Sequence, residues 1–239
     1  MVNFKQYLTE IKISLECHDV LNPKIWENEK IKPEVKQALL KFIDTWREFS
    51  KIPKSLVRDI IFTGGNANFN YTSKSDLDVH LIIDRLSIGT DKQLVDEYLQ
   101  DKKTLWSLTH DVKIVGYSVE PYAQDYRVSF PKGQGVYSLK TDEWIQKPEF
   151  NKCNLGNDTV LKQKVKHYMS VIDHMIKNKV SVSHIKQFKN KLKDMRSSAI
   201  QRGGEYSLEN LVFKELRNKG YLEKLNKFEK SSQDENLSL

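Results

Sequence analysis

The segment that most restricts the fold of this chain is residues 57–84, where two apolar strands flank a polar loop. Residues 57–63 (Val-Arg-Asp-Ile-Ile-Phe-Thr) are rich in β-branched residues and end at Gly64-Gly65. Residues 76–84 alternate acidic or polar side chains with leucine, valine and isoleucine. Alternate side chains of a strand point to opposite faces, so we expect the second strand to have one face in the core and one polar face.

Residues with helical spacing surround this segment. Before it, we expect a short amphipathic helix over residues 3–15 and a longer one over 33–49, where Pro33 stands in the first turn. After it, residues 91–108 have a helical pattern, and residues 111–145 contain β-rich pieces separated by glycine and proline. The first part of the chain therefore predicts an α/β organisation.

From residue 157 onward the apolar period is helical throughout. Three apolar stripes run between residues 161 and 216, and the third ends at Gly220. The residues from 229 onward are polar, so we expect a frayed or disordered tail. The sequence therefore predicts a domain with N-terminal helices over 1–153, a helical domain over 154–228 and a tail over 229–239.

The net charge of +7 is unevenly distributed. Residues 1–150 contain 21 Lys and Arg against 22 Asp and Glu, a charge of −1, whereas residues 151–239 contain 18 against 10, a charge of +8. A basic half joined to a neutral half favours contact between the C-terminal part and phosphate, on a nucleotide or a nucleic acid. The alternative is a solvated lysine-rich surface.

Cysteine usage and hydropathy point away from secretion and membranes. No apolar run approaches the roughly 18 residues needed to span a bilayer, and the N-terminus has no continuous apolar stretch or small-residue cleavage site. Cys17 and Cys153 are far apart and belong to no Cys/His cluster, so we expect neither a disulfide scaffold nor a zinc site. A reducing cytoplasm is the expected compartment, with no membrane partner.

Two features of residues 62–81 indicate chemistry. Gly64-Gly65 follows a strand directly, and a glycine pair lets backbone N–H groups approach an anion because no side chain is in the way. Asp76 and Asp78 stand two apart on the next strand, so their side chains share a face about 6.6 Å apart along the chain. Two such carboxylates repel each other unless a cation lies between them. Oxygen ligands without clustered Cys or His suit Mg²⁺ or Mn²⁺.

These residues resemble a known signature. Thr63-Gly64-Gly65 followed by Ser75-Asp76-Leu77-Asp78 is similar to the signature of the DNA polymerase β-like nucleotidyltransferase superfamily, and the stretch around it is similar to small predicted nucleotidyltransferases common in phage genomes. The resemblance implies a small mixed β-sheet with flanking helices, followed here by a helical C-terminal domain. It also implies that Gly64, Gly65 and Ser75 bind an NTP, that Asp76 and Asp78 bind two Mg²⁺ ions, and that a third carboxylate lies on a neighbouring strand. Gly65 stands where many members have Ser.

The third carboxylate has two candidates. Glu120 follows Val119 in a pair similar to the usual strand position of this acid in the family, and it is the candidate that we favour. Asp111 begins the same β-rich region and could instead cap a strand. Pro121 follows Glu120 directly and is unusual in a central strand.

A basic ridge is expected in the helical part. Its members, Lys186, Lys189, Lys193 and Arg196, follow one another at steps of three and four residues on one helix face. The functional interpretation is an electrostatic clamp for a triphosphate, which makes Lys189, Lys193 and Arg196 nucleotide-binding candidates, or for a nucleic-acid backbone. The alternative interpretation is a solvated helix face.

Together these observations predict a metal-dependent, cytoplasmic nucleotidyltransferase that releases pyrophosphate from an NTP. The acceptor hydroxyl could belong to an RNA or DNA 3′ end, a protein or a small molecule. The hypothesis from a different class is a non-catalytic module that binds nucleotides or nucleic acid.

Overall fold

The computed structural model describes residues 11–151 and 153–238, and the chain divides into two compact units. One unit is Cys17–Lys152, and the other combines Met1–Glu16 with Cys153–Leu239. The later division between the two units falls between Lys152 and Cys153. The described part of the first sixteen residues, however, belongs with the helical unit and not with the sheet.

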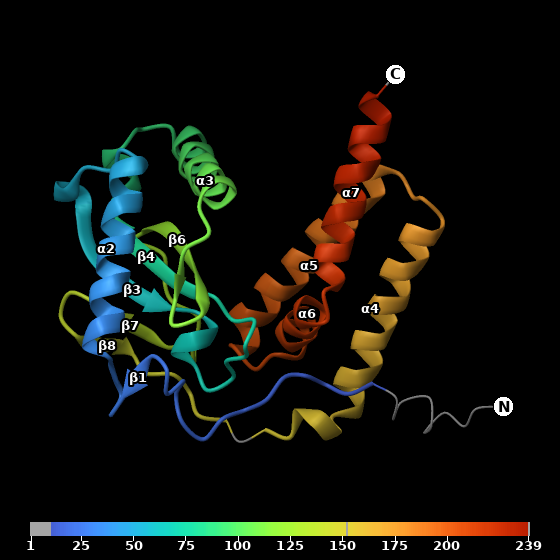
Figure 1. Ribbon diagram of the computed structural model, residues 1–239, viewed down its shortest axis with the longest axis horizontal. Helices are drawn as coiled ribbons and strands as arrows, with labels where there is room; N and C mark the ends of the chain where they lie inside the picture. The colour runs from blue at the N-terminus through green and yellow to red at the C-terminus, as the bar shows by residue number, and fades with distance from the viewer. Residues whose placement is uncertain (1–10, 152, 239) are drawn as a thin grey trace. The chain divides into compact units, whose positions relative to one another are not determined.

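A mixed sheet forms the centre of the α/β unit, as the sequence analysis expects (Figure 1). Within the described residues its strand order is β5-β6-β4-β3-β7-β8. β4 runs antiparallel to β3 and parallel to β6. The strands are β3 (Val57–Thr63), β4 (Leu77–Ile83), β5 (Lys113–Ile114), β6 (Tyr117–Asp125), β7 (Val136–Ser138) and β8 (Glu143–Gln146). A separate two-stranded sheet pairs β1 (Trp26–Glu27) with β2 (Lys30–Ile31).

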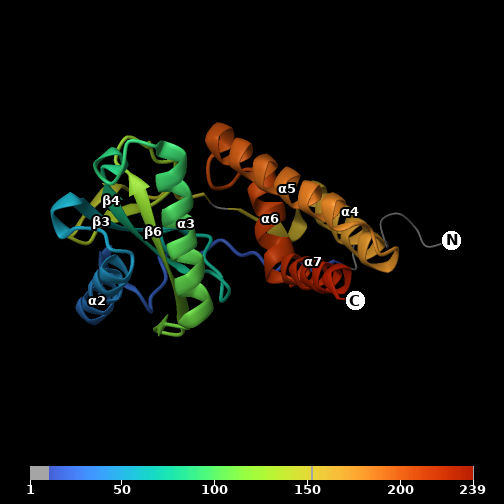
Figure 2. The same cartoon turned by 90° about the horizontal axis from the view of Figure 1, so that it is seen from above.

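Helices α2 (Pro33–Phe49) and α3 (Lys92–Thr109) supply the apolar cover of this sheet. Val35, Leu39, Phe42, Ile43 and Trp46 of α2 share one core with the odd-numbered β4 residues and with Val95, Leu99 and Trp106 of α3. Figure 2 shows α3 running alongside β6. The odd-numbered residues of β4 therefore face the helices, and Asp78 and His80 lie on the opposite face. The connections include short 3₁₀ turns, η1 (Lys54–Leu56), η2 (Gly65–Ala67) and η3 (Arg85–Ser87).

Pro121 fits the sheet because of its place in β6. It pairs with Val79 of β4 on one side, whereas β5 pairs only with Tyr117 and Ser118 on the other. The stretch of β6 that contains Pro121 is thus the outer strand at that point, where a missing N–H breaks no ladder.

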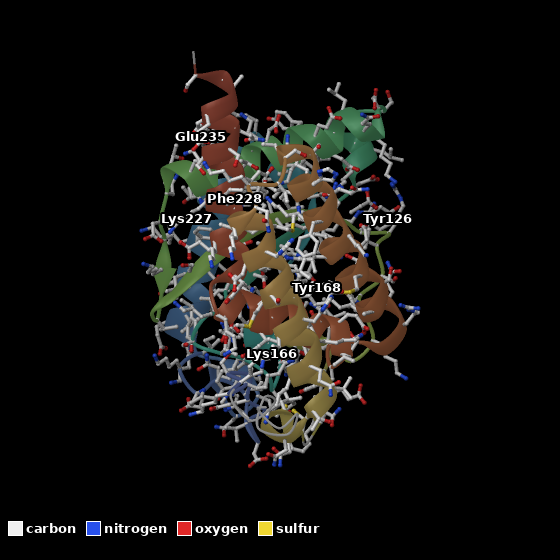
Figure 3. All side chains as sticks on the ribbon, turned by 90° about the vertical axis from the view of Figure 1, so that its right-hand side faces the viewer. Tyr126, Lys166, Tyr168, Lys227, Phe228 and Glu235 are labelled. Carbon is white, nitrogen blue, oxygen red and sulfur yellow. The ribbon has the colours of Figure 1, made fainter. Side chains whose placement is uncertain are left out.

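The helical unit contains α4 (Thr159–Lys177), α5 (Val182–Gly203), α6 (Leu208–Asn218) and α7 (Tyr221–Leu237), preceded by the 3₁₀ turn η4 (Leu155–Asn157). Asp158 caps α4 by accepting a hydrogen bond from the Leu161 N–H at 2.9 Å. Ile172, Met175, Ile185 and Leu225 form a core shared by α4, α5 and α7, and Phe228 of α7 packs against it (Figure 3).

Polar contacts tie the segment before residue 17 to this unit. The Ser14 N–H and hydroxyl both donate to the Glu215 carboxylate, at 2.9 and 2.8 Å, and the Lys219 ammonium donates to the Lys12 carbonyl at 2.8 Å. Ile13 and Leu15 are buried. The helix predicted over 3–15 is absent from its described part, since residues 11–15 have no regular secondary structure; residues 3–10 lie outside the described residues.

Two further expectations need correction. The segment from residue 229 is not an irregular tail but continues α7 to Leu237, because Leu225 anchors the helix in the core and Glu229 pairs with Lys189 at 2.5 Å. Cys17 and Cys153 are both disulfide-bonded, which the sequence analysis did not expect.

No helix among the described residues is long and apolar enough to cross a membrane.

Candidate functional site

Gly64 brings the turn after β3 against an acidic side chain. Its backbone has φ +80° and ψ −163°, a region that is essentially restricted to glycine. A Cβ at this position would overlap the Asp78 carboxylate. The chain therefore needs glycine at Gly64 for two reasons, the backbone conformation and the close approach of Asp78.

Buried asparagines hold the loop that joins this turn to β4. The Asn66 amide donates to the carbonyl oxygens of Ser75 and Asp76, at 3.3 and 3.0 Å. The Asn68 amide donates to the Gly64 carbonyl at 2.6 Å, and its oxygen accepts from the Gly135 N–H at 2.9 Å. Sequence reasoning missed these residues, although the alternating asparagines 66, 68 and 70 were a visible signal for a loop stabilised by side-chain amides.

Strand register brings two of the predicted acids side by side. Asp78 pairs with Thr63 of β3 on one side and with Glu120 of β6 on the other. Neighbouring strands are about 4.8 Å apart, so Asp78 and Glu120 are direct neighbours on the face away from α2. Asp76 precedes β4 by one residue, and Asn66 holds its carbonyl. The sheet thus places Asp78 between the glycine turn and Glu120.

The other candidate for the third carboxylate lies elsewhere. Asp111 precedes β5, is largely exposed, and pairs with Lys113 at 3.1 Å. Glu120, in contrast, is held from α3, where Lys103 Nζ lies 2.9 Å from its Oε2.

His80 is two residues after Asp78 in β4, so it lies on the same face of the sheet. Burial lowers its pKa to about 4, although a hydrogen bond with Gln124 at 2.9 Å acts in the opposite direction. Its ring also contacts Tyr122 edge-on at 5.1 Å. His80 is therefore a neutral histidine packed against Tyr122 and Gln124.

Ser75 and Gly65 contact each other within the loop. Ser75 is buried, and its hydroxyl accepts a hydrogen bond from the Thr72 N–H at 2.9 Å. A Cβ on Gly65 would lie 2.9 Å from the Ser75 oxygen. The Ser75 hydroxyl therefore stabilises the loop in this structure.

The four members of the basic ridge lie in different surroundings within the helical unit. Lys186 and Lys193 are exposed. Lys189 pairs with Glu229 of α7, while Arg196 donates to the Asn210 side chain at 3.0 Å and stacks on Phe213 at 4.8 Å. Two of the four cations thus contribute to helix packing.

The acids fit a hard divalent cation in residue type and in strand register, since carboxylate oxygens are the ligands that Mg²⁺ and Mn²⁺ prefer. The Asp78 carboxylate lies directly against the Gly64 backbone, so the acid and the glycine turn are in contact. Across residues 11–151 and 153–238, no three Asp, Glu, His or Cys side chains converge as a complete ligand set.

No family model and no curated protein matches this chain. Among solved structures, it is similar to the STING-associated CdnE c-di-GMP synthase from Capnocytophaga granulosa, with 12% sequence identity and a TM-score of 0.21 over 86% of this chain and 83% of that chain.

Proposed function

We propose that this protein is a metal-dependent nucleotidyltransferase that moves a nucleoside monophosphate from an NTP to an acceptor hydroxyl and releases pyrophosphate. One observation supports this proposal above the others: Asp78 contacts the Gly64 turn on one side and is in register with Glu120 on the other. The glycine turn and the acid pair thus adjoin each other. This is the arrangement that the resemblance of residues 63–78 implies.

Each residue of this surface has a role in the proposal. The turn at Gly64 and Gly65 receives the triphosphate, because the backbone there is not covered by a Cβ. Asp76, Asp78 and Glu120 would hold Mg²⁺ or Mn²⁺. When bound, such ions neutralise charge on phosphate oxygens and favour deprotonation of the attacking hydroxyl. Asn66 and Asn68 keep the turn and the start of β4 in fixed relation.

For the acceptor we propose a nucleic-acid 3′ end. The supporting observation is the charge of +8 in residues 151–239, with Lys186 and Lys193 exposed on α5. Positive charge of this kind attracts a phosphate backbone in a salt-dependent way. Protein and small-molecule acceptors use the same carboxylates, so the test includes them.

The test is label transfer from each α-³²P NTP with Mg²⁺ or Mn²⁺ and pools of RNA, DNA, protein or small hydroxyl compounds. We expect the wild type and an Asp111→Asn control to transfer label, and Asp78→Asn to lose at least about a thousandfold in rate, which corresponds to about 4 kcal/mol. Asp78→Asn should remain folded, because the change relieves repulsion between neighbouring carboxylates. Transfer by Asp78→Asn at the wild-type rate would show that the active site lies elsewhere.

A further inference from the structure

A lysine from α3 already neutralises one acid of the candidate site. Lys103 Nζ lies 2.9 Å from Glu120 Oε2, and the two side chains are 25% and 44% exposed. The Lys103 ammonium also lies 5.7 Å from the centre of the Tyr122 ring, a residue two positions after Glu120 on the same face of β6. Ion pair and ring contact together give Lys103 a defined position next to Glu120.

The ligand set at this site is incomplete among the described residues. Register makes Glu120 the direct neighbour of Asp78, yet within the described residues no three acidic, His or Cys side chains converge. The Glu120 carboxylate interacts instead with a cation that belongs to the protein. An ammonium group and a divalent ion therefore compete for the same carboxylate.

We propose that Lys103 is an internal counter-cation, which holds Glu120 in the metal-free protein and releases it when a divalent cation binds. This role rests on the proposed function, since it requires Asp78 and Glu120 to be ligands. A partly exposed ion pair is weak, whereas a divalent ion interacts with several carboxylates and with twice the charge. Lys103 is thus a positioning residue that sets the affinity of the site for metal and keeps Glu120 in place without it.

The test is a titration of the full chain with Mn²⁺ alone. The electron paramagnetic resonance signal of free Mn²⁺ measures how much of the ion is bound. Lys103→Met removes the competing charge and should tighten Mn²⁺ binding about fivefold, the upper end of what an exposed pair contributes. Lys102→Met is the matched control, because Lys102 lies next to Lys103 on α3 but contacts the rings of Phe49 and Tyr98. It should change the affinity by no more than about twofold. Lys103→Arg should keep the wild-type affinity.

Glu120→Gln completes the experiment. In that background Lys103→Met should no longer tighten binding, because the carboxylate for which both cations compete is gone. Thermal melts followed by circular dichroism identify any variant that fails to fold, and Lys103→Gln then replaces Lys103→Met. A purely structural role for Lys103 would weaken Mn²⁺ binding when the lysine is lost, the opposite of the expected change.

The outcomes separate this role from the proposed function. Suppose that Mn²⁺ binding depends on Asp78 but is equally tight in Lys103→Met and Lys102→Met: this result overturns the counter-cation role alone. The same conclusion follows if Lys103→Met still tightens Mn²⁺ binding in the Glu120→Gln background. Absence of binding in both the wild type and Lys103→Met overturns the role and the proposed metal site together. Binding by Lys103→Met in the absence of wild-type binding supports the role.

Discussion

The two units use their charged residues in opposite ways. In the α/β unit, Asp78 and Glu120 lie on the sheet face away from the helical core, brought together by strand register. In the helical unit, charged groups point inward: Lys214 and Glu205 form a buried ion pair, and Glu215, fully buried, accepts hydrogen bonds from Ser14. The first arrangement brings two carboxylates together beside the glycine turn, whereas the second uses charge to join helices.

This difference changes the meaning of the net charge. The excess of +8 in residues 151–239 suggests a basic surface when it is counted along the sequence. Glu229, Glu205 and Glu209 are already subtracted in that count, and in the fold they pair with Lys189, Lys214 and Lys164 within the helical unit. The net charge along the sequence therefore does not distinguish lysines that form ion pairs within this unit from lysines that are exposed to solvent.

The largest effect on stability should come from the buried pair of the helical unit. Glu205→Gln leaves the Lys214 ammonium buried without its carboxylate, so we expect a loss of about 3 kcal/mol in the free energy of unfolding, measured by urea denaturation. Glu223→Gln is the control, because its pair with Lys227 is exposed, and its cost should be below about 0.5 kcal/mol. Equal costs for both changes would contradict the contrast between buried and exposed charge.

At the glycine turn we expect a smaller loss in the free energy of unfolding, together with a loss of activity. Gly64→Ala should cost about 2 kcal/mol for the backbone conformation alone, and it should also displace the Asp78 carboxylate and reduce transfer. Gly65→Ser should cost about 1 kcal/mol or less, because only the contact with Ser75 must adjust, and it should retain activity. Melting curves and initial rates of pyrophosphate release compare the two, and a fully active Gly64→Ala protein would disprove the turn's role.

The smallest effects separate the two halves of the basic ridge. Lys189→Gln with Arg196→Gln should lower stability by about 1 kcal/mol, since these residues join α5 to α7 and α6. Lys186→Gln with Lys193→Gln should change stability by no more than about 0.5 kcal/mol. If nucleic acid binds there, replacing the exposed pair Lys186 and Lys193 should make log K fall less steeply with log salt, by about 0.7–0.9 per lost phosphate contact. An unchanged slope and unchanged NTP affinity would leave only the packing role.

The sequence by itself determined the elements whose pattern is local. The helix over 33–49 and the strand over 57–63 have the predicted bounds, and the second strand and the helix near 91–108 agree to within a residue at each end. The reason is that hydrophobic period, a proline in the first turn and a glycine after a strand all act over a few residues. The same local alternation puts Asp78 on the face of β4 opposite the apolar residues, where it meets the glycine turn.

Only the tertiary structure decided which distant residues meet. Glu120 is distinguished from Asp111 by its register with Asp78, and Lys103 reaches Glu120 from another element. Ser14 meets Glu215 across 201 positions, and α7 extends through residues whose composition suggests a tail. Strand register, ion pairs and helix docking depend on the burial of whole elements against one another, and no pattern within one segment contains that information.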